Sequence, residues 1–219
     1  MSNPDSVDYE EKDNEIEVLV DDSKKKSPYT DTKINPHNGE SISELVCSPN
    51  MKYFATISDE DHSIFGWEIK EGQSELEPDY SINFEKYTSN TWTLLGVSNN
   101  KYILLQKDYD IELIDLETGS EQKLLTGAVD GASFLENGDV VMVEGKPVYR
   151  ASIFSKPNPN NGRQYKYKSS IELTKYNKCA ISRKGKLLIL LDIPFVIMQW
   201  DLETLMFEAQ YVLDLAFNT

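Results

Sequence analysis

The stretch Val196-Ile197-Met198-Gln199-Trp200-Asp201-Leu202-Glu203-Thr204 carries the clearest information about the fold of this chain. It begins with apolar and β-branched residues, as a strand does, and it ends in Trp-Asp and a polar turn. Its last four residues, Asp-Leu-Glu-Thr, occur verbatim at Asp115-Leu116-Glu117-Thr118, 86 residues earlier. A verbatim repeat at this distance indicates two periods of a unit of about 43 residues.

Two further copies of this pattern align with the first two. In every copy a polar turn is followed by an apolar strand, a second turn and a second apolar strand. The polar turns begin at Ser48, Ser98, Leu135 and Ser182, and the second apolar strands contain Trp67, Ile114, Ile153 and Trp200. Taking the latter four as equivalent gives steps of 47, 39 and 47 residues. A period of roughly 40–45 residues, with short strands and almost no helical periodicity, predicts one four-stranded propeller blade per repeat.

The repeats predict an all-β fold, a partial or small β-propeller of about four four-stranded antiparallel blades. The blades are expected at residues 35–88, 89–127, 128–174 and 175–213. Their strands are expected at residues 45–47, 53–57, 64–69, 80–84, 93–97, 102–106, 111–116, 122–125, 132–135, 140–143, 148–154, 165–173, 178–181, 186–191, 195–202 and 207–212. A piece of a larger propeller, an open arc and a closed four-bladed ring are the alternatives. Exposed blade edges invite pairing with another chain, so self-association is one expected interaction.

Residues 1–34 differ in composition from the rest of the chain. They are poor in apolar residues and rich in Asp, Glu, Ser and Lys, which predicts a disordered acidic tail. Within this tail, Lys24-Lys25-Lys26-Ser27-Pro28 is either a phosphorylation or docking site or a part of a solvated linker.

The charge balance disfavours two classes of partner. The 22 Lys and Arg residues and the 37 Asp and Glu residues give a formal net charge of −15. A chain this acidic is repelled by phosphate backbones and by anionic lipid headgroups, so neither nucleic acid nor a membrane surface is an expected partner. Apolar residues make up 39% of the 219 residues, which is enough for a sizeable core.

Three observations predict a cytoplasmic location. Cys47 and Cys179 are too few for a disulfide framework, which favours a reducing compartment. The N-terminus has no basic region followed by an apolar core, so no secretory leader is expected. The longest apolar stretch, Leu187 to Met198, contains Asp192 and Pro194. Because a spanning helix needs roughly 20 apolar residues, we expect a buried hairpin there and no membrane insertion.

The period and the Trp-Asp ending resemble the WD-repeat family over about residues 35–213. In that family a His bonds an Asp in a tight turn, and a Ser or Thr links the His to the strand Trp. In the first repeat the resemblance assigns these roles to His37, Asp61, Thr56 or Ser58, and Trp67. The second and third repeats lack the Trp, the fourth has Pro194 where the turn Asp would fall, and no repeat has the family's Gly-His pair. The tetrad is therefore expected in the first repeat alone.

A second resemblance also rests on the first repeat. Pro36-His37-Asn38-Gly39, Ser48-Pro49-Asn50-Met51-Lys52-Tyr53 and Ser63-Ile64-Phe65-Gly66-Trp67 resemble the start of a fungal family of large membrane proteins. Those proteins carry a degenerate cytosolic propeller ahead of an ion-transport domain. The resemblance implies a cytosolic regulatory segment of an ion-channel-like protein, or a shortened relative of one.

The residues that could react all have a simpler structural interpretation. His37 fits the tetrad, His62 lies in a charged turn, and no serine lies in a Gly-x-Ser-x-Gly elbow. Cys47 and Cys179 lack zinc spacing and are expected to pack in the core on the first strands of their blades. Asp59-Glu60-Asp61 lacks the pattern of a calcium loop and is expected to be a solvated turn.

Two further groups complete the candidates. Asp192 is expected to mark a hairpin turn. The locally basic and aromatic residues are Lys166, Lys168 and Lys175 with Tyr165, Tyr167 and Tyr176. They are a nucleic-acid contact, a docking face for an acidic partner or a solvated edge, and the net charge argues against the first. No catalytic, cofactor-binding or metal-ligating residue is predicted.

These observations predict a non-catalytic protein–protein interaction scaffold without a cofactor, whose protein partner the sequence does not identify. The alternative is a small propeller enzyme, glycosidase-like or esterase-like, that uses carboxylates the sequence does not single out.

Overall fold

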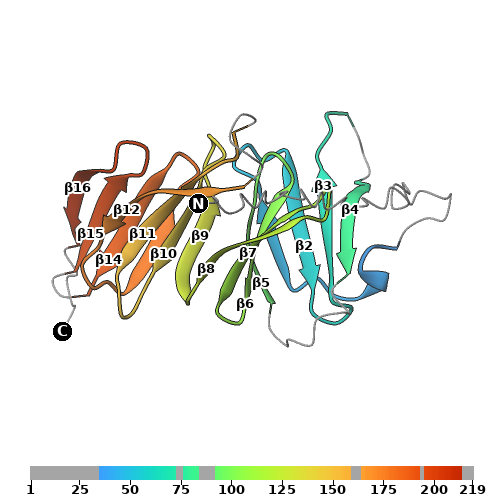
Figure 1. The fold of residues 1–219 in the computed structure, drawn as a ribbon, viewed down its shortest axis with the longest axis horizontal. Helices are drawn as coiled ribbons and strands as arrows, with labels where there is room; N and C mark the ends of the chain where they lie inside the picture. Colours follow the sequence, from blue (N-terminus) through green and yellow to red (C-terminus); the bar gives the residue numbers. More distant parts are fainter. Residues whose placement is uncertain (1–34, 73–75, 84–91, 159–163, 193–194, 214–219) are drawn as a thin grey trace, which may run out of the picture. The chain divides into compact units, whose positions relative to one another are not determined.

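Sixteen strands and one short turn make up the part of the chain that the computed structural model describes, residues 35–72, 76–83, 92–158, 164–192 and 195–213. The strands form four separate four-stranded antiparallel sheets (Figure 1). The turn, η2 (Pro36–Gly39), precedes the first sheet. The predicted acidic tail, residues 1–34 with its Lys24–Pro28 motif, lies outside the described residues.

Each sheet is a meander of four consecutive strands. The first sheet holds β1 (Glu44–Cys47), β2 (Tyr53–Ser58), β3 (Ser63–Glu68) and β4 (Pro78–Asn83). The second holds β5 (Trp92–Val97), β6 (Tyr102–Lys107), β7 (Asp110–Asp115) and β8 (Glu121–Thr126). The third holds β9 (Val129–Phe134), β10 (Val140–Glu144), β11 (Arg150–Ser155) and β12 (Lys166–Glu172). The fourth holds β13 (Lys178–Ile181), β14 (Lys186–Leu191), β15 (Val196–Asp201) and β16 (Met206–Val212). The strands begin and end within three residues of the predicted positions, and the predicted fold class is confirmed.

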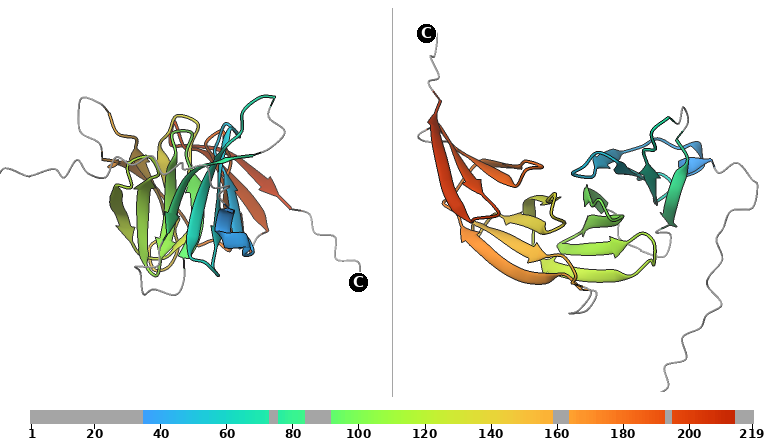
Figure 2. Two further views of the ribbon diagram at one scale, coloured as in Figure 1. Left: turned by 90° about the vertical axis from the view of Figure 1, so that its right-hand side faces the viewer. Right: turned by 90° about the horizontal axis from the view of Figure 1, so that it is seen from above.

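The four sheets stack in chain order through their first strands. Strand β1 contacts β5, β5 contacts β9, and β9 contacts β13, which is the blade arrangement of a β-propeller. Seen from above in Figure 2, the sheets follow one another along an open curve with the first and fourth sheets at its ends. Among the described residues, no strand of the fourth sheet packs against the first sheet as these neighbours pack. Three apolar cores fill the three junctions between consecutive sheets.

The same tight turn joins the first and second strands of every sheet. The backbone N–H three residues into the turn donates to the carbonyl at its start, in the pairs Met51–Ser48, Lys101–Ser98, Gly138–Leu135 and Gly185–Ser182. All four donor residues have positive φ, between 61° and 88°. The repetition seen in the sequence is therefore also a repetition of backbone conformation.

The structure corrects one predicted equivalence, in the third repeat. Trp67 pairs with Phe54 and Trp200 with Leu187, each next to a shift of register in the ladder with the fourth strand. In the third sheet the residue with these properties is Phe154, which pairs with Val140, so the predicted Ile153 is wrong by one position. Since side chains alternate between faces, a slip of one residue places Ile153 on the opposite face of its sheet.

The predicted hairpin at Leu187 to Met198 is formed by β14 and β15, on which Leu187, Ile189 and Val196 are buried. No helix of the length and apolarity needed to cross a membrane occurs in the described part of the chain.

Candidate functional site

The first candidate site surrounds His37, which η2 carries onto the first sheet. Pro36 begins the turn, and His37 adopts a left-handed conformation with φ 55° that directs its ring onto the sheet. The ring is 2% exposed and contacts Phe65 edge to face at 4.7 Å. Thr56 and Trp67 lie on the same sheet face, opposite to the face that packs on the second sheet.

One continuous chain of hydrogen bonds runs through this site. Trp67 Nε1 donates to Thr56 Oγ1 at 2.8 Å, and Thr56 Oγ1 lies 2.8 Å from His37 Nε2. On the other side, His37 Nδ1 lies 2.7 Å from Ser63 Oγ, which donates to Asp61 Oδ1 at 2.6 Å. His37 and Asp61 are thus linked through Ser63, with Nδ1 and Oδ1 at 3.7 Å.

The hydrogen bonds of Ser63 indicate that Nδ1 of the His37 ring carries a proton. Ser63 gives its proton to Asp61, so its oxygen accepts a proton from His37 Nδ1. Thr56 Oγ1 accepts from Trp67, and its own hydroxyl is free to donate to Nε2 when that nitrogen carries no proton. A neutral ring with its proton on Nδ1 satisfies both of these contacts. Burial lowers the pKa of His37 below its usual value of 6.5, against the opposing charge of Asp61, and this also favours the neutral ring.

The expected tetrad is therefore present in the first sheet, with Thr56 and not Ser58 as the link. The hydroxyl of Ser58 is buried, and it has no hydrogen-bond partner among the described residues. Sequence reasoning missed Ser63, whose only signal is its position two residues after Asp61. Because both ring nitrogens of His37 are occupied, the ring holds η2 on the sheet and is not free to act as a base.

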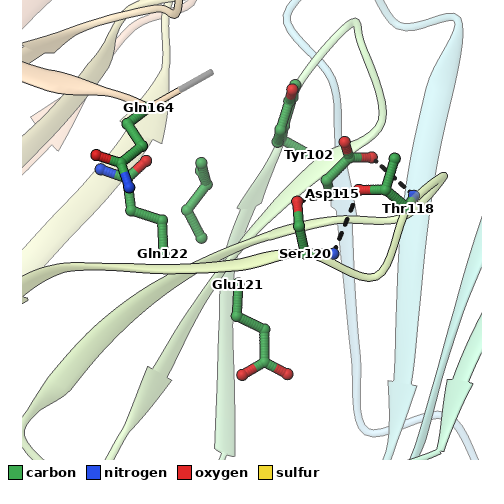
Figure 3. Close-up of a pocket in the computed structure, with 8 residues that line it drawn as sticks. Tyr102, Asp115, Thr118, Ser120, Glu121, Gln122 and Gln164 are labelled. Atoms are coloured by element: carbon green, nitrogen blue, oxygen red, sulfur yellow. Dashed lines mark hydrogen bonds between the residues drawn. The ribbon is translucent and has the colours of Figure 1, made fainter. Parts of the chain in front are cut away.

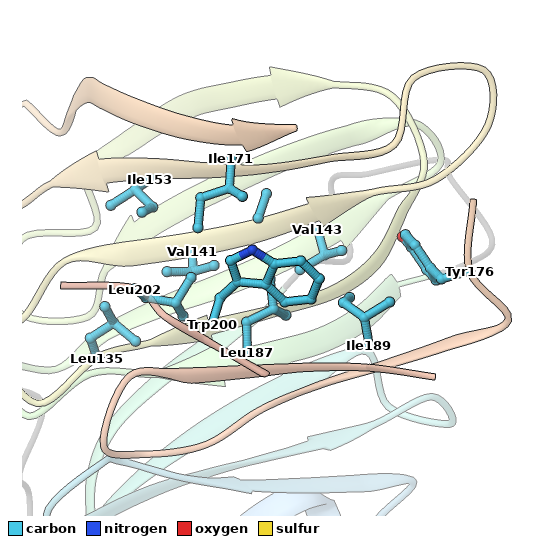
Figure 4. Packing of buried hydrophobic residues seen from close by; sticks show 11 residues of the cluster. Leu135, Val141, Val143, Ile153, Ile171, Tyr176, Leu187, Ile189, Trp200 and Leu202 are labelled. Carbon is cyan, nitrogen blue, oxygen red and sulfur yellow. The ribbon is translucent and has the colours of Figure 1, made fainter. Parts of the chain in front are cut away.

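The other three sheets build the same position from apolar side chains. The equivalents of Thr56 are Leu105, Met142 and Ile189, which are fully buried and carry no hydroxyl. Trp200 instead packs in the apolar core between the third and fourth sheets, on Leu187, Ile189 and their neighbours (Figure 4). Its ring also contacts Phe207 edge to face at 5.5 Å.

The second candidate site, the Tyr176 pocket, is a hollow of about 480 Å³ at the junction of the third and fourth sheets. Tyr176 donates to Asp130 Oδ2 at 2.8 Å and packs edge to face on Tyr149 at 5.3 Å. Burial and the neighbouring carboxylate raise the pKa of Tyr176, so its hydroxyl remains protonated. The exposed Lys146 and Lys175 also line the pocket.

Asp192 lines the Tyr176 pocket as well, directly after β14, where a hairpin turn was expected. Its carboxylate accepts a hydrogen bond from Asn177 Nδ2 at 2.5 Å. The pocket thus combines two tyrosine rings with two acidic and two basic side chains.

The third candidate site, the Gln122 pocket, is a hollow of about 270 Å³ at the opposite ends of the strands, between the second and third sheets (Figure 3). The Gln122 amide pairs with the backbone of Tyr165, donating at 2.7 Å and accepting at 2.8 Å. Asp115 accepts from the backbone N–H groups of Glu117 and Thr118 at 2.9 and 3.3 Å. The polar groups of this pocket thus hold the β7–β8 turn and the start of β12.

The remaining acidic and histidine candidates lie in one exposed turn. His62, Asp59 and Glu60 are exposed between β2 and β3, and Ser41 donates to Glu60 at 2.6 Å. Within the described ranges, no three His, Cys, Asp or Glu side chains are grouped so that they could hold a metal ion.

The two cysteines differ in their surroundings. Cys179 is half-buried and packs against the core of the third and fourth sheets, as expected. The predicted burial of Cys47 is wrong, because β1 alternates between half-buried and exposed residues and Cys47 lies on its exposed side.

The basic and aromatic residues do not form one surface. Tyr165 and Tyr176 are buried, whereas Tyr167 is 59% exposed on β12. Lys168 is engaged by Asp139 at 2.9 Å. The alternation of tyrosines and lysines near β12 therefore has a structural origin, because Tyr165 belongs to the core and Tyr167 lies on a solvated outer strand.

Comparisons with known proteins identify the fold alone. No family model matches the chain, and no curated protein sequence matches it. One similar structure is Kuenenia stuttgartiensis hydrazine synthase, with 12% identity and a TM-score of 0.51 over 77% of this chain and 48% of that one. Another is dihydro-heme d1 dehydrogenase NirN in complex with DHE, with 12% identity and a TM-score of 0.52 over 80% of this chain and 38% of that one.

A third similar structure is KlHsv2 with loop 6CD replaced by a Gly-Ser linker. It has 15% identity and a TM-score of 0.52 over 77% of this chain and 51% of that one. This chain thus spans about half or less of the length of these three proteins.

Proposed function

We propose that this chain is a non-catalytic protein–protein interaction scaffold built on a WD-type propeller. The observation that carries the proposal is that the central polar side chain of each candidate site already bonds to another part of the chain. His37 links Thr56 and Ser63, Tyr176 bonds Asp130, and Gln122 bonds the backbone of Tyr165. Groups held in this way position loops for a partner to contact.

The WD-type part of the proposal is supported by the first sheet. A Trp, a Thr, a His and an Asp are linked there in the order that the family resemblance implies, with Ser63 inserted before the Asp. The other repeats keep the backbone turn and the strand order without this motif.

We assign the partner to the Tyr176 pocket. It is the larger of the two hollows, and it offers two tyrosine rings, a residue type that is enriched in protein-binding sites. Its charges of both signs can select a partner of complementary charge. Its rim is formed by loops of two sheets, so a partner peptide can span the junction.

The test is capture of a stoichiometric partner by the full chain, followed by two charge reversals. Lys146→Glu combined with Lys175→Glu should abolish capture. Glu121→Lys, which reverses a charge on the Gln122 pocket, should leave capture unchanged. Loss with Glu121→Lys alone would move the site to the other pocket. Turnover of any member of a panel of glycoside and ester substrates would overturn the non-catalytic assignment in favour of a small propeller enzyme.

We further propose that the chain acts in the cytoplasm as a regulatory segment of an ion-channel-like membrane protein. The support is the resemblance of the first repeat, whose residues supply η2, the tight turn at Ser48 and the His37 hydrogen-bond chain. Proximity labelling in cells should mark a protein with an ion-transport domain. Labelling of soluble proteins alone would contradict this proposal and leave the scaffold assignment standing.

A further inference from the structure

The sheets meet in a fixed order at all three junctions. We use "preceding face" for the face of a sheet turned toward the earlier sheet in the chain, and "following face" for the face turned toward the later one. At each junction the following face of one sheet packs on the preceding face of the next. Within the described residues, two faces have no sheet packed on them: the preceding face of the first sheet and the following face of the fourth (Figure 2).

The following face of the fourth sheet is built like the buried following faces of the other three. The equivalent positions are Ala55, Ile57, Ile64 and Gly66; Leu104, Gln106, Ile111 and Leu113; Val141, Val143, Ala151 and Ile153; and Leu188, Leu190, Ile197 and Gln199. In the first three sheets the apolar side chains at these positions are at most 3% exposed. In the fourth sheet all four are only half-buried, and Tyr211, which pairs with Ile197, is 49% exposed.

The preceding face of the first sheet shows the same difference from its equivalents. Phe54 and Trp67 are half-buried and stack on each other at 5.7 Å. Their equivalents in the other sheets are Ile103 and Ile114, Val140 and Phe154, and Leu187 and Trp200. These six side chains are at most 8% exposed, because a preceding sheet covers them.

We infer that the occupant of the fourth sheet's following face is the first sheet of a second copy of this chain. Each internal junction joins a following face to a preceding face, and the two faces without a sheet on them are one of each kind. On the first sheet, η2 covers Thr56 and Phe65 through the His37 ring and leaves Phe54 and Trp67 half-buried. A second copy therefore offers the complementary surface, with Phe54 and Trp67 placed against Leu188, Leu190 and Ile197. Two copies joined head to tail form two such junctions and close a ring of eight blades, within the range of four to eight that propellers adopt.

This arrangement differs from pairing at blade edges, because it buries apolar faces rather than backbone hydrogen-bonding groups. It deepens the proposed scaffold function by naming one partner and its surface. Each chain carries a net charge of −15, so two copies repel each other through water. Salt screens this repulsion and does not weaken apolar burial, so association should strengthen as the salt concentration rises.

The test is sedimentation equilibrium of the full 219-residue chain, whose mass is 25.0 kDa. The wild type should form a dimer, and Leu190→Glu should weaken dimerisation at least about tenfold, since a carboxylate would be buried without a partner. Phe54→Lys should do the same from the other face, with its stem lying on Trp67. Mixing the two variants should restore a dimer, because one junction then joins the introduced carboxylate of one chain to the introduced ammonium group of the other. Lys184→Glu, in an exposed turn, is the matched control and should not change the mass.

Each variant is accompanied by thermal unfolding, so that loss of folding is separated from loss of association. If Leu190→Glu fails to fold, Ile197→Lys replaces it on the same face. A wild-type chain that stays monomeric at high salt would overturn the inference. A dimer insensitive to Phe54→Lys would overturn the head-to-tail arrangement. Capture of another protein through the Tyr176 pocket does not depend on these residues, so the proposed scaffold function can succeed or fail independently.

Discussion

Trp67 in the first sheet and Trp200 in the fourth occupy the same position in their blades, yet they are held in different ways. Both lie on the third strand, on the preceding face, next to a shift of register. Trp67 donates a hydrogen bond to Thr56, and further hydrogen bonds connect Thr56 through His37 and Ser63 to Asp61. Trp200 lies over Ile189 in an apolar core, next to the third sheet.

The difference shows how a repeat can lose its sequence motif and keep its shape. The hydrogen-bonded residues of the first sheet depend on one another, because each one satisfies a donor or an acceptor of the next. Loss of one residue therefore leaves its neighbour without a partner. Once a residue such as Ile189 replaces the hydroxyl, a buried His above it would lack a partner. Apolar packing against the neighbouring sheet then has to fix the position of the Trp ring. The two sheets represent these two solutions on one backbone.

The largest expected effect is that of Trp200→Ala. Truncation of an aromatic side chain that is 8% exposed leaves a void in the core and should lower the free energy of unfolding by about 3–5 kcal/mol. Trp67→Ala should cost less, because Trp67 is only half-buried in the first sheet. Denaturant unfolding of both variants measures the difference, and equal losses would contradict the comparison.

The next effect is that of Thr56→Val, which removes the link between Trp67 and His37. The indole N–H and the ring nitrogen Nε2 both lose their partner inside the protein, so we expect a loss of about 1–3 kcal/mol. Ile189→Thr is the reciprocal variant in the fourth sheet. It should also destabilise, because both histidines of the chain lie in the first repeat and neither can accept from the new hydroxyl. A gain in stability in the second variant would show that the apolar solution is not required there.

The strands could be predicted from the sequence because each one depends on local information. Short apolar runs between polar turns recur at a nearly constant period, and the turns at Ser48, Ser98 and Ser182 use the same side-chain and backbone bonds. The position of Phe154 could not be predicted in this way. Its face is set by the pairing of β11 with β10, and therefore by the length of the connection between them, residues 145–149, which no sequence pattern fixes.

The His37 site was accessible from the sequence through a family resemblance, and only in part. The resemblance left Thr56 and Ser58 as alternatives, since both are polar residues on the same face of β2. Their distinction depends on the position of the His37 ring, which η2 sets through left-handed backbone conformations. Ser63 and the two pockets depend on contacts between separate strands and loops, so no spacing rule reveals them.

The pH dependence of stability should report on the burial of His37. The pKa of His37 is lowered on folding, so the unfolded chain takes up a proton at higher pH than the folded chain. Stability should therefore be full above the usual pKa of 6.5 and should fall as the pH drops below it. Unfolding measured between about pH 8 and 5.5 checks this. His37→Gln should flatten the dependence, and His62→Gln in the exposed turn should leave it in place.

The smallest expected effect is that of Ser58→Ala, on the same face as Thr56. Its hydroxyl is buried, and the described residues offer it no hydrogen-bond partner, so its desolvation on folding is uncompensated. Removing the oxygen should leave stability unchanged or raise it by up to about 1 kcal/mol, in contrast to the loss on changing Thr56. The pair of variants separates a hydroxyl that links two side chains from one that does not. A loss with Ser58→Ala equal to that with Thr56→Val would mean that Ser58 also serves the His37 ring, and the chain of bonds derived above would need a second branch.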